Sequence, residues 1–178
     1  MSDNAIADAF LESCVRRLKN DKILGEKAIA QLSDEELLWQ PDAESNSIAI
    51  IIQHMHGNMI SRWTNFLTTD GEKPSRNRDR EFDLYDNLNR TDLIQLWEEG
   101  WACVVDAVQA LNSGDLLKTI TIREQEFGVI DAIHRQLTHY AYHVGQIVYI
   151  AKHHRGAAWE TLSIAKGKSA EFKPGKKD

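Results

Sequence analysis

Two histidines four residues apart, His139 and His143, have the clearest capacity for chemistry in this sequence. Both lie within a long run of helical apolar periodicity. A helix places residues i and i+4 on one face, with Cβ atoms roughly 5–6 Å apart. Two imidazoles at that spacing can bind one metal ion through bonds of about 2 Å. Histidines also occur half-buried in helices with ordinary partners, so the pair alone leaves both interpretations open.

A third ligand would have to come from another element, and the best candidate is His54, inside a second strongly apolar helix. His56 is rotated about 200° from His54 on that helix and is expected at the surface. The face around the pair is otherwise apolar, with Ile130, Ile133, Leu137, Val144, Ile147 and Ile150. Unpaired imidazoles are costly to bury there, and a metal would satisfy them. Three protein ligands leave a coordination position open, which is typical of catalytic sites.

Several polar residues could assist such a site. Asn58 and Gln146 lie close in sequence to the candidate ligands and could orient ligands or substrate, or they could form ordinary hydrogen bonds between helices. The segment from 69 to 83 is rich in charges of both signs. It is either a solvated connection or a loop that folds over the site and supplies Arg76 and Arg78 to an anionic ligand.

Four long amphipathic helices are predicted to position these side chains. Apolar residues recur at helical spacing over about 5–32, 48–68, 91–111 and 128–154. Gly25 weakens the middle of the first helix and is expected to mark a bend.

The shorter segments add little regular structure. Ser33 and Glu36 match a capping box that opens a short helical turn. Residues 118–123 alternate and are β-branched, so they could be extended, but one strand cannot form a sheet. We therefore predict an all-α fold, a four-helix bundle over residues 1–165, followed by a basic C-terminal tail over 166–178.

The composition excludes some functions. The chain has 178 residues, 42% hydrophobic and 27% charged, with a formal charge of −6. That charge argues against nucleic acid as a partner. No apolar run approaches the roughly 20 residues of a membrane span, and the N-terminus lacks the order of a signal peptide, so we expect a cytoplasmic protein. Cys14 and Cys103 have no metal-binding spacing and are expected to be core thiols.

With the helices and histidines in place, the chain resembles the DinB/YfiT-like superfamily, and most closely an uncharacterised bacterial branch of it. The residues that carry the resemblance are Asn46 to His54, Gly57 to Trp63, Phe66 to Lys73, Arg76 to Arg78, His139 to Gln146 and Ser163 to Gly167. The block from His139 to Gln146 has the pattern HxxxHxGQ. The resemblance covers nearly the whole chain.

The resemblance implies an up-down-down-up four-helix bundle, usually a homodimer, with zinc or nickel on three histidines. Carried over, the ligands are His54, His139 and His143. Superfamily members transfer or isomerise groups with low-molecular-weight thiols, or are metal-dependent hydrolases. A homodimer also agrees with the surplus of large apolar residues, including five tryptophans.

Three hypotheses about function follow. The first is a metal-dependent enzyme, in which the ion activates a thiol or water toward a small-molecule substrate, as in a thiol-dependent S-transferase. The second is a non-catalytic metal-binding stress-response protein. The third is a bundle whose histidines are structural. If imidazoles hold the metal, protons compete with it, and the ordinary histidine pKa of about 6.5 predicts that affinity falls below about pH 6.

Overall fold

A computed structural model describes residues 3–85, 88–171 and 173. Most of the described chain is helical, which confirms the mainly helical prediction, and one small antiparallel sheet is present. The α-helices are α1 (Asp3–Ile29), α2 (Asp34–Leu38), α3 (Ile48–Trp63), α4 (Arg90–Gln109) and α5 (Val129–Arg155). The sheet contains β1 (Thr119–Ile122) and β2 (Gln125–Gly128), and short 3-10 turns are η1 (Asp79–Phe82), η2 (Asp115–Leu117) and η3 (Gly156–Ala158).

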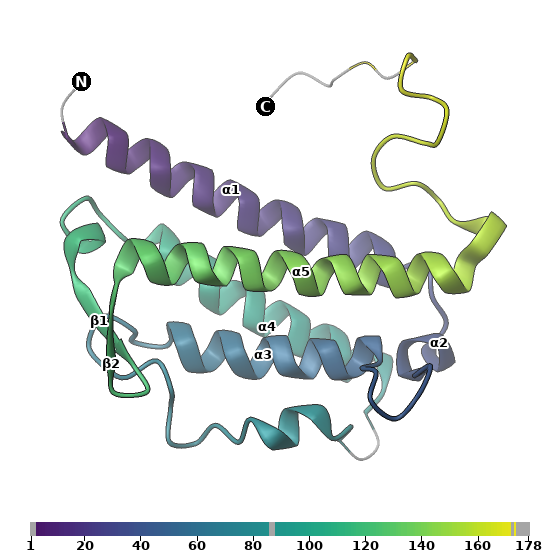
Figure 1. Cartoon of the computed structure of the whole chain (residues 1–178), viewed down its shortest axis with the longest axis horizontal. Helices are drawn as coiled ribbons and strands as arrows, with labels where there is room; N and C mark the ends of the chain where they lie inside the picture. The colour runs from purple at the N-terminus through teal and green to yellow at the C-terminus, as the bar shows by residue number, and fades with distance from the viewer. Residues whose placement is uncertain (1–2, 86–87, 172, 174–178) are drawn as a thin grey trace.

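The four long helices pack against one another through their apolar faces. α3 lies against α4 and α5, and α1 lies against α4 and α5. Figure 1 shows the sheet at one end of these helices and α2 at the other. Trp97, Trp101 and Tyr140 are fully buried between them, and their rings meet edge to face, with centroids 5.4 and 5.7 Å apart. Aromatic side chains therefore fill the centre of the core.

Side-chain caps explain where several helices begin. Ser33 accepts a hydrogen bond from the backbone of Glu36, whose carboxylate accepts one in return, so the predicted capping box is confirmed. Ser47 caps α3 by accepting from the N–H of Ile50. Such caps satisfy backbone N–H groups that have no partner within the helix.

Two helices end before their predicted limits. α1 ends at Ile29 rather than near residue 32, and α3 ends at Trp63 rather than near residue 68. Asn65 has a φ of 50°, and its carbonyl accepts hydrogen bonds from the N–H groups of Thr68 and Thr69. The chain thus turns after α3 although apolar residues continue at helical spacing.

Gly25 does not interrupt the first helix. α1 is continuous through it, and a Cβ at Gly25 would lie 2.5 Å from Cζ2 of Trp97. The glycine is needed because the Trp97 ring packs directly on the α1 backbone.

Gly25→Ala is therefore expected to destabilise the protein. Overpacking costs about 1–3 kcal/mol, while alanine is favoured over glycine within a helix by about 1 kcal/mol, so we expect a net loss of up to about 2 kcal/mol in urea unfolding. Gly145→Ala in α5 is the matched control, because a Cβ there meets no described atom within 4 Å; it should stabilise the protein. Equal stabilisation by both changes would contradict this account of Gly25.

The extended piece predicted near residues 118–123 does form a sheet, so the prediction of no sheet is wrong. β1 pairs antiparallel with β2, from Thr119 opposite Gly128 to Ile122 opposite Gln125. The partner was missed because residues 125–128 carry no apolar alternation. The turn between the strands places Arg123 and Glu124 at positive φ, 54° and 62°, where glycine and asparagine are usual.

The remaining sequence expectations concern the membrane, the thiols and the tail. None of the described helices combines the length and apolar character that crossing a membrane requires. Cys14 is buried and Cys103 half-buried, and neither forms a disulfide. Burial raises the pKa of both thiols, which agrees with the expectation that they pack in or near the core. Residues 172 and 174–178 of the expected tail lie outside the described chain.

Candidate metal centre

Three histidines from two helices meet at one point of the structure. His139 and His143 lie on consecutive turns of α5, and His54 faces them from α3. Each offers a ring nitrogen, and these atoms all lie within 4.8 Å of one another. We call His54, His139 and His143 the triad. The triad could hold a metal ion, which is the property that the sequence pattern indicated.

The nitrogen separations within the triad suit a metal. Nε2 of His54 lies 3.3 Å from Nε2 of His139. Two nitrogens bound at about 2.0–2.1 Å with tetrahedral angles would be about 3.3–3.4 Å apart. His54 and His143 are only 5% and 6% exposed, so bulk solvent has little access to their nitrogens.

Hydrogen bonds at the opposite edges of two rings fix their tautomers. Nδ1 of His54 lies 2.9 Å from Oε2 of Glu81, and an ionised carboxylate only accepts, so Nδ1 carries the hydrogen. Nδ1 of His143 likewise donates to Oε1 of Gln146 at 2.8 Å. Both assignments follow from the hydrogen-bond network, and they leave the Nε2 lone pairs directed into the triad.

Unpartnered nitrogens complete the fit. Within the described chain, Nε2 of His143 and Nδ1 of His139 are buried without any hydrogen-bond partner. Buried polar atoms of this kind are uncommon and need an explanation. A metal would account for the unpartnered Nε2 of His143, and the Nε2 atoms of His54 and His139, which lie 3.3 Å apart, could bind the same ion.

Burial also favours the neutral imidazoles that a metal requires. Burial, with smaller effects from His143 and His54, lowers the pKa of His139 to about 3. Burial lowers the pKa of His143 to about 4, against a small opposing effect of Gln146. Protons should therefore compete with a metal for these two rings only at a pH below the value of about 6 that the ordinary histidine pKa predicts.

Acid is expected to destabilise the metal-free protein through these rings. In the unfolded chain they take up protons below about pH 6.5, whereas in the folded chain they stay neutral to about pH 4 for His143 and about 3 for His139. The unfolded state then binds more protons, so stability is full above about pH 6.5 and falls as the pH drops toward 3. Thermal unfolding of the metal-free protein between pH 7 and 4 measures this. His139→Gln should flatten the dependence; an unchanged slope would contradict the assignment.

Glu81, which sequence analysis did not single out, connects His54 to a buried ion-pair network. The carboxylate is 2% exposed and accepts from Arg76 twice, at 2.7 Å from Nε and 2.9 Å from Nη2. Burial alone raises the pKa of Glu81, but the hydrogen bonds from Arg76 and His54 outweigh it, so the pKa is lowered and the group is ionised. A carboxylate behind a histidine fixes the ring of a metal ligand.

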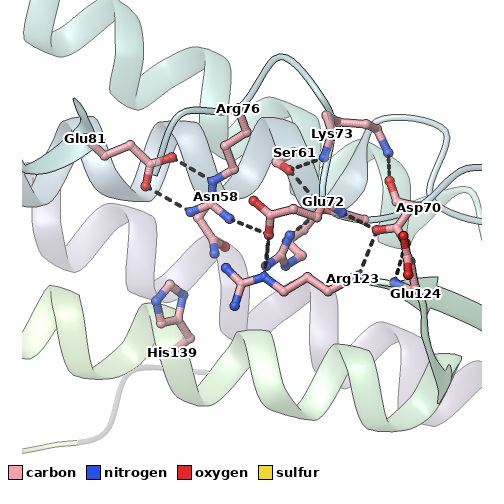
Figure 2. Close-up of polar contacts among 12 residues, drawn as sticks. Asn58, Ser61, Asp70, Glu72, Lys73, Arg76, Glu81, Arg123, Glu124 and His139 are labelled. Atoms are coloured by element: carbon pink, nitrogen blue, oxygen red, sulfur yellow. Dashed lines mark hydrogen bonds and ion pairs between the residues drawn. The ribbon is translucent and has the colours of Figure 1, made fainter. Parts of the chain in front are cut away.

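The network continues from Glu81 and Arg76 to the β1–β2 turn (Figure 2). Glu72 accepts from Arg62 at 2.8 Å and from Arg123 at 3.0 Å, and it lies 3.5 Å from Arg76. Since Arg123 belongs to the turn between the strands, this chain of contacts links the sheet to the triad.

Asp70 holds the β1–β2 turn from the other side. Its carboxylate accepts from the backbone N–H groups of Arg123 and Glu124, at 2.9 and 2.8 Å, and of Glu72 at 2.6 Å. Those backbone hydrogen bonds, with that of Glu124 the largest, lower the pKa of Asp70. The unusual positive-φ residues are thus fixed by a neighbouring loop.

Much of the segment from 69 to 83 is exposed, but part of it packs on the candidate site. η1 packs on α3, and Phe82 stacks on His54 with ring centroids 4.9 Å apart. The loop does fold over the site, but Arg76 is committed to Glu81 and Glu72. Arg78 is exposed, and its guanidinium lies 5.1 Å from the centre of the Phe82 ring.

The other polar candidates take different positions. Gln146 contacts the triad directly through His143. Asn58 instead accepts a hydrogen bond from Tyr140 at 3.1 Å, and Trp63 donates to the same hydroxyl at 3.0 Å, so Asn58 joins α3 to α5.

His56, expected at the surface, is half-buried and lies outside the triad. Its Nε2 is 3.4 Å from a carboxylate oxygen of Glu99 in α4. The expectation was wrong because α4 covers this face of α3.

Comparison with known proteins gives one match. A family described as "Protein of unknown function (DUF1572)" matches residues 5–168. No curated protein and no solved structure matches the chain. Since the match spans most of the sequence, the protein belongs to the DUF1572 family.

Proposed function

We propose that the protein is a metal-dependent enzyme of the DinB/YfiT-like superfamily. The arrangement of the long helices supports membership: in Figure 1, α1 and α5 run in one direction and α3 and α4 in the other, as in an up-down-down-up four-helix bundle. The single observation that carries the proposal is the convergence of the triad, with ligand atoms within 4.8 Å of one another and with Nε2 of His143 buried and unpartnered in the described chain.

In this proposal His54, His139 and His143 hold one divalent ion, zinc or nickel. Imidazole suits both metals. When bound, the ion would lower the pKa of a thiol or water so that it becomes a nucleophile near neutral pH. The thiol is a low-molecular-weight cofactor, because the chain's own cysteines lie elsewhere in the fold and burial raises the pKa of both.

The surrounding residues have supporting roles. Glu81 and Gln146 hold the rings of His54 and His143 in their metal-binding tautomers. Phe82 covers His54 on one side, and Tyr142 packs on His143 with ring centroids 4.3 Å apart. Together they limit water access, which strengthens electrostatic interactions within the site.

A second candidate is a non-catalytic metal-binding protein. The near-complete burial of His54 and His143 favours it, because a substrate needs a route to the ion. A screen of the zinc- and nickel-loaded protein with several low-molecular-weight thiols and electrophiles separates the two. The enzyme predicts turnover that chelation abolishes and metal restores. Tight metal binding without turnover would leave only the binding role.

A further inference from the structure

Gly145 is an unexpected residue within α5. It lies in the second half of this long helix, where glycine costs about 1 kcal/mol relative to alanine. Its φ is not positive, and a Cβ added there would meet no described atom within 4 Å. Neither backbone conformation nor packing within the chain therefore requires glycine at this position, and the space beside it is open.

That space is part of a cleft of about 610 Å³. One wall is α5, with Tyr142, Gly145, Gln146 and Tyr149, and the other is the segment from residues 41 to 46. The second wall forms hydrogen bonds within itself. Asp42 accepts hydrogen bonds from the backbone N–H groups of Glu44 and Ser45, at 2.9 and 3.0 Å, and Gln40 donates to the carbonyl of Ser45.

None of the three triad residues lines the cleft, but two residues that do line it contact triad rings. Gln146 lines the cleft and accepts a hydrogen bond from His143. Tyr142 lines it as well, and its ring lies 4.3 Å from that of His143 and 5.2 Å from that of His139. A molecule in the cleft would therefore reach the residues that touch two of the three candidate ligands.

The lining points to the chemistry of the occupant. Glu44 is the one charged side chain among the described residues that line the cleft, and no Asp, Glu, Lys or Arg occurs in α5 between Arg135 and Lys152. The other side chains that line the cleft are aromatic or aliphatic, or end in an amide or a hydroxyl group. Tyr149, with 76% of its surface exposed, offers a large ring to an aromatic or aliphatic group.

We infer that this cleft binds the uncharged, aromatic or aliphatic part of the substrate, whose reacting group then lies at the triad. The inference rests on the proposed function. An anionic tail is disfavoured, because the lining holds a carboxylate and no cation to pair with it. Gly145 is the residue that keeps the cleft open.

Hydroxamates, which chelate metals with an open position, test the inference on the zinc-loaded protein. The probes are acetohydroxamate, analogues with phenyl-terminated alkyl tails of increasing length, and the same analogues with a carboxylate on the ring. We expect the best phenyl tail to tighten binding by at least about tenfold, because the ring leaves water. In Gly145→Leu most of that gain should vanish, while acetohydroxamate binds as before. Ala141→Leu, exposed on the same helix but outside the cleft, is the control and should keep the gain.

Each failure has a distinct meaning. If acetohydroxamate does not bind the zinc-loaded protein, the open metal centre and the cleft inference both fall. If it binds but no tail adds affinity, or Gly145→Leu keeps the gain, the cleft inference is overturned while the metal centre stands. Tighter binding of the carboxylate analogues would overturn the substrate class. Sedimentation showing a dimer that Gly145→Leu dissociates would assign this face to a second copy of the chain instead.

Discussion

Replacing His54 with alanine is expected to lower the affinity for zinc or nickel by more than about 100-fold, because the loss of an outer hydrogen-bonding partner alone costs 10–100-fold. His54 is the contribution of α3 to the triad, and the two rings that remain both come from α5. Glu81 keeps its two hydrogen bonds from Arg76 in the variant. The helical circular-dichroism signal should therefore stay close to that of the unchanged protein. Competition with a chromogenic chelator measures the affinity.

The control for this change is His134→Ala. His134 is exposed on α5, and its ring contacts Phe10 at a centroid distance of 5.4 Å. The His134→Ala substitution removes a histidine that does not belong to the triad, so metal affinity should not change. Equal losses in both variants would indicate nonspecific binding, and a collapsed helical signal in His54→Ala would mean that the histidine is structural.

Glu81→Ala is expected to destabilise the protein by about 3–5 kcal/mol, since it leaves a buried charge without its partner. Arg76 is 4% exposed at its side chain, and Glu72 lies 3.5 Å away at the edge of the same network. The change also removes the acceptor for Nδ1 of His54, so metal affinity should fall about 10–100-fold. Urea unfolding and metal titration measure the two effects separately.

A double variant separates stability from positioning. Replacing both charges, as Arg76→Met with Glu81→Leu, removes the unpaired charge, so stability should recover relative to Glu81→Ala. Metal affinity should stay low, because His54 still lacks its carboxylate. Glu126→Ala, an exposed glutamate in β2, should change neither quantity by more than about 0.5 kcal/mol. Recovery of metal affinity in the double variant would show that Glu81 acts only through stability.

The histidines of the triad could be found from sequence because helical periodicity is local. Positions i and i+4 of a helix share a face, so His139 and His143 had to be neighbours. His54 required the additional assumption that its helix packs on the first, and the strong apolar character of that helix supported the assumption. The long helices were predicted for the same reason, and their ends were less accurate where turns such as that at Asn65 interrupted the pattern.

The partners of these histidines could not be found in this way. Glu81 is 27 residues from His54 in sequence. Its loop is hydrophilic in sequence, and nothing in that pattern indicates that Glu81 and Arg76 pair with each other inside the fold. The turn of the hairpin depends on a distant residue as well: Arg123 and Glu124 have positive φ, and Asp70, more than fifty residues earlier, accepts hydrogen bonds from their N–H groups. Such tertiary contacts leave no periodic signal in the sequence.

The most direct test of the metal centre is a crystal structure of the untagged protein grown with zinc, with data collected on both sides of the zinc absorption edge. We expect one anomalous peak per chain, about 2.0–2.1 Å from a ring nitrogen of each of His54, His139 and His143. Well-ordered density for all three rings without an anomalous peak between them would contradict this expectation.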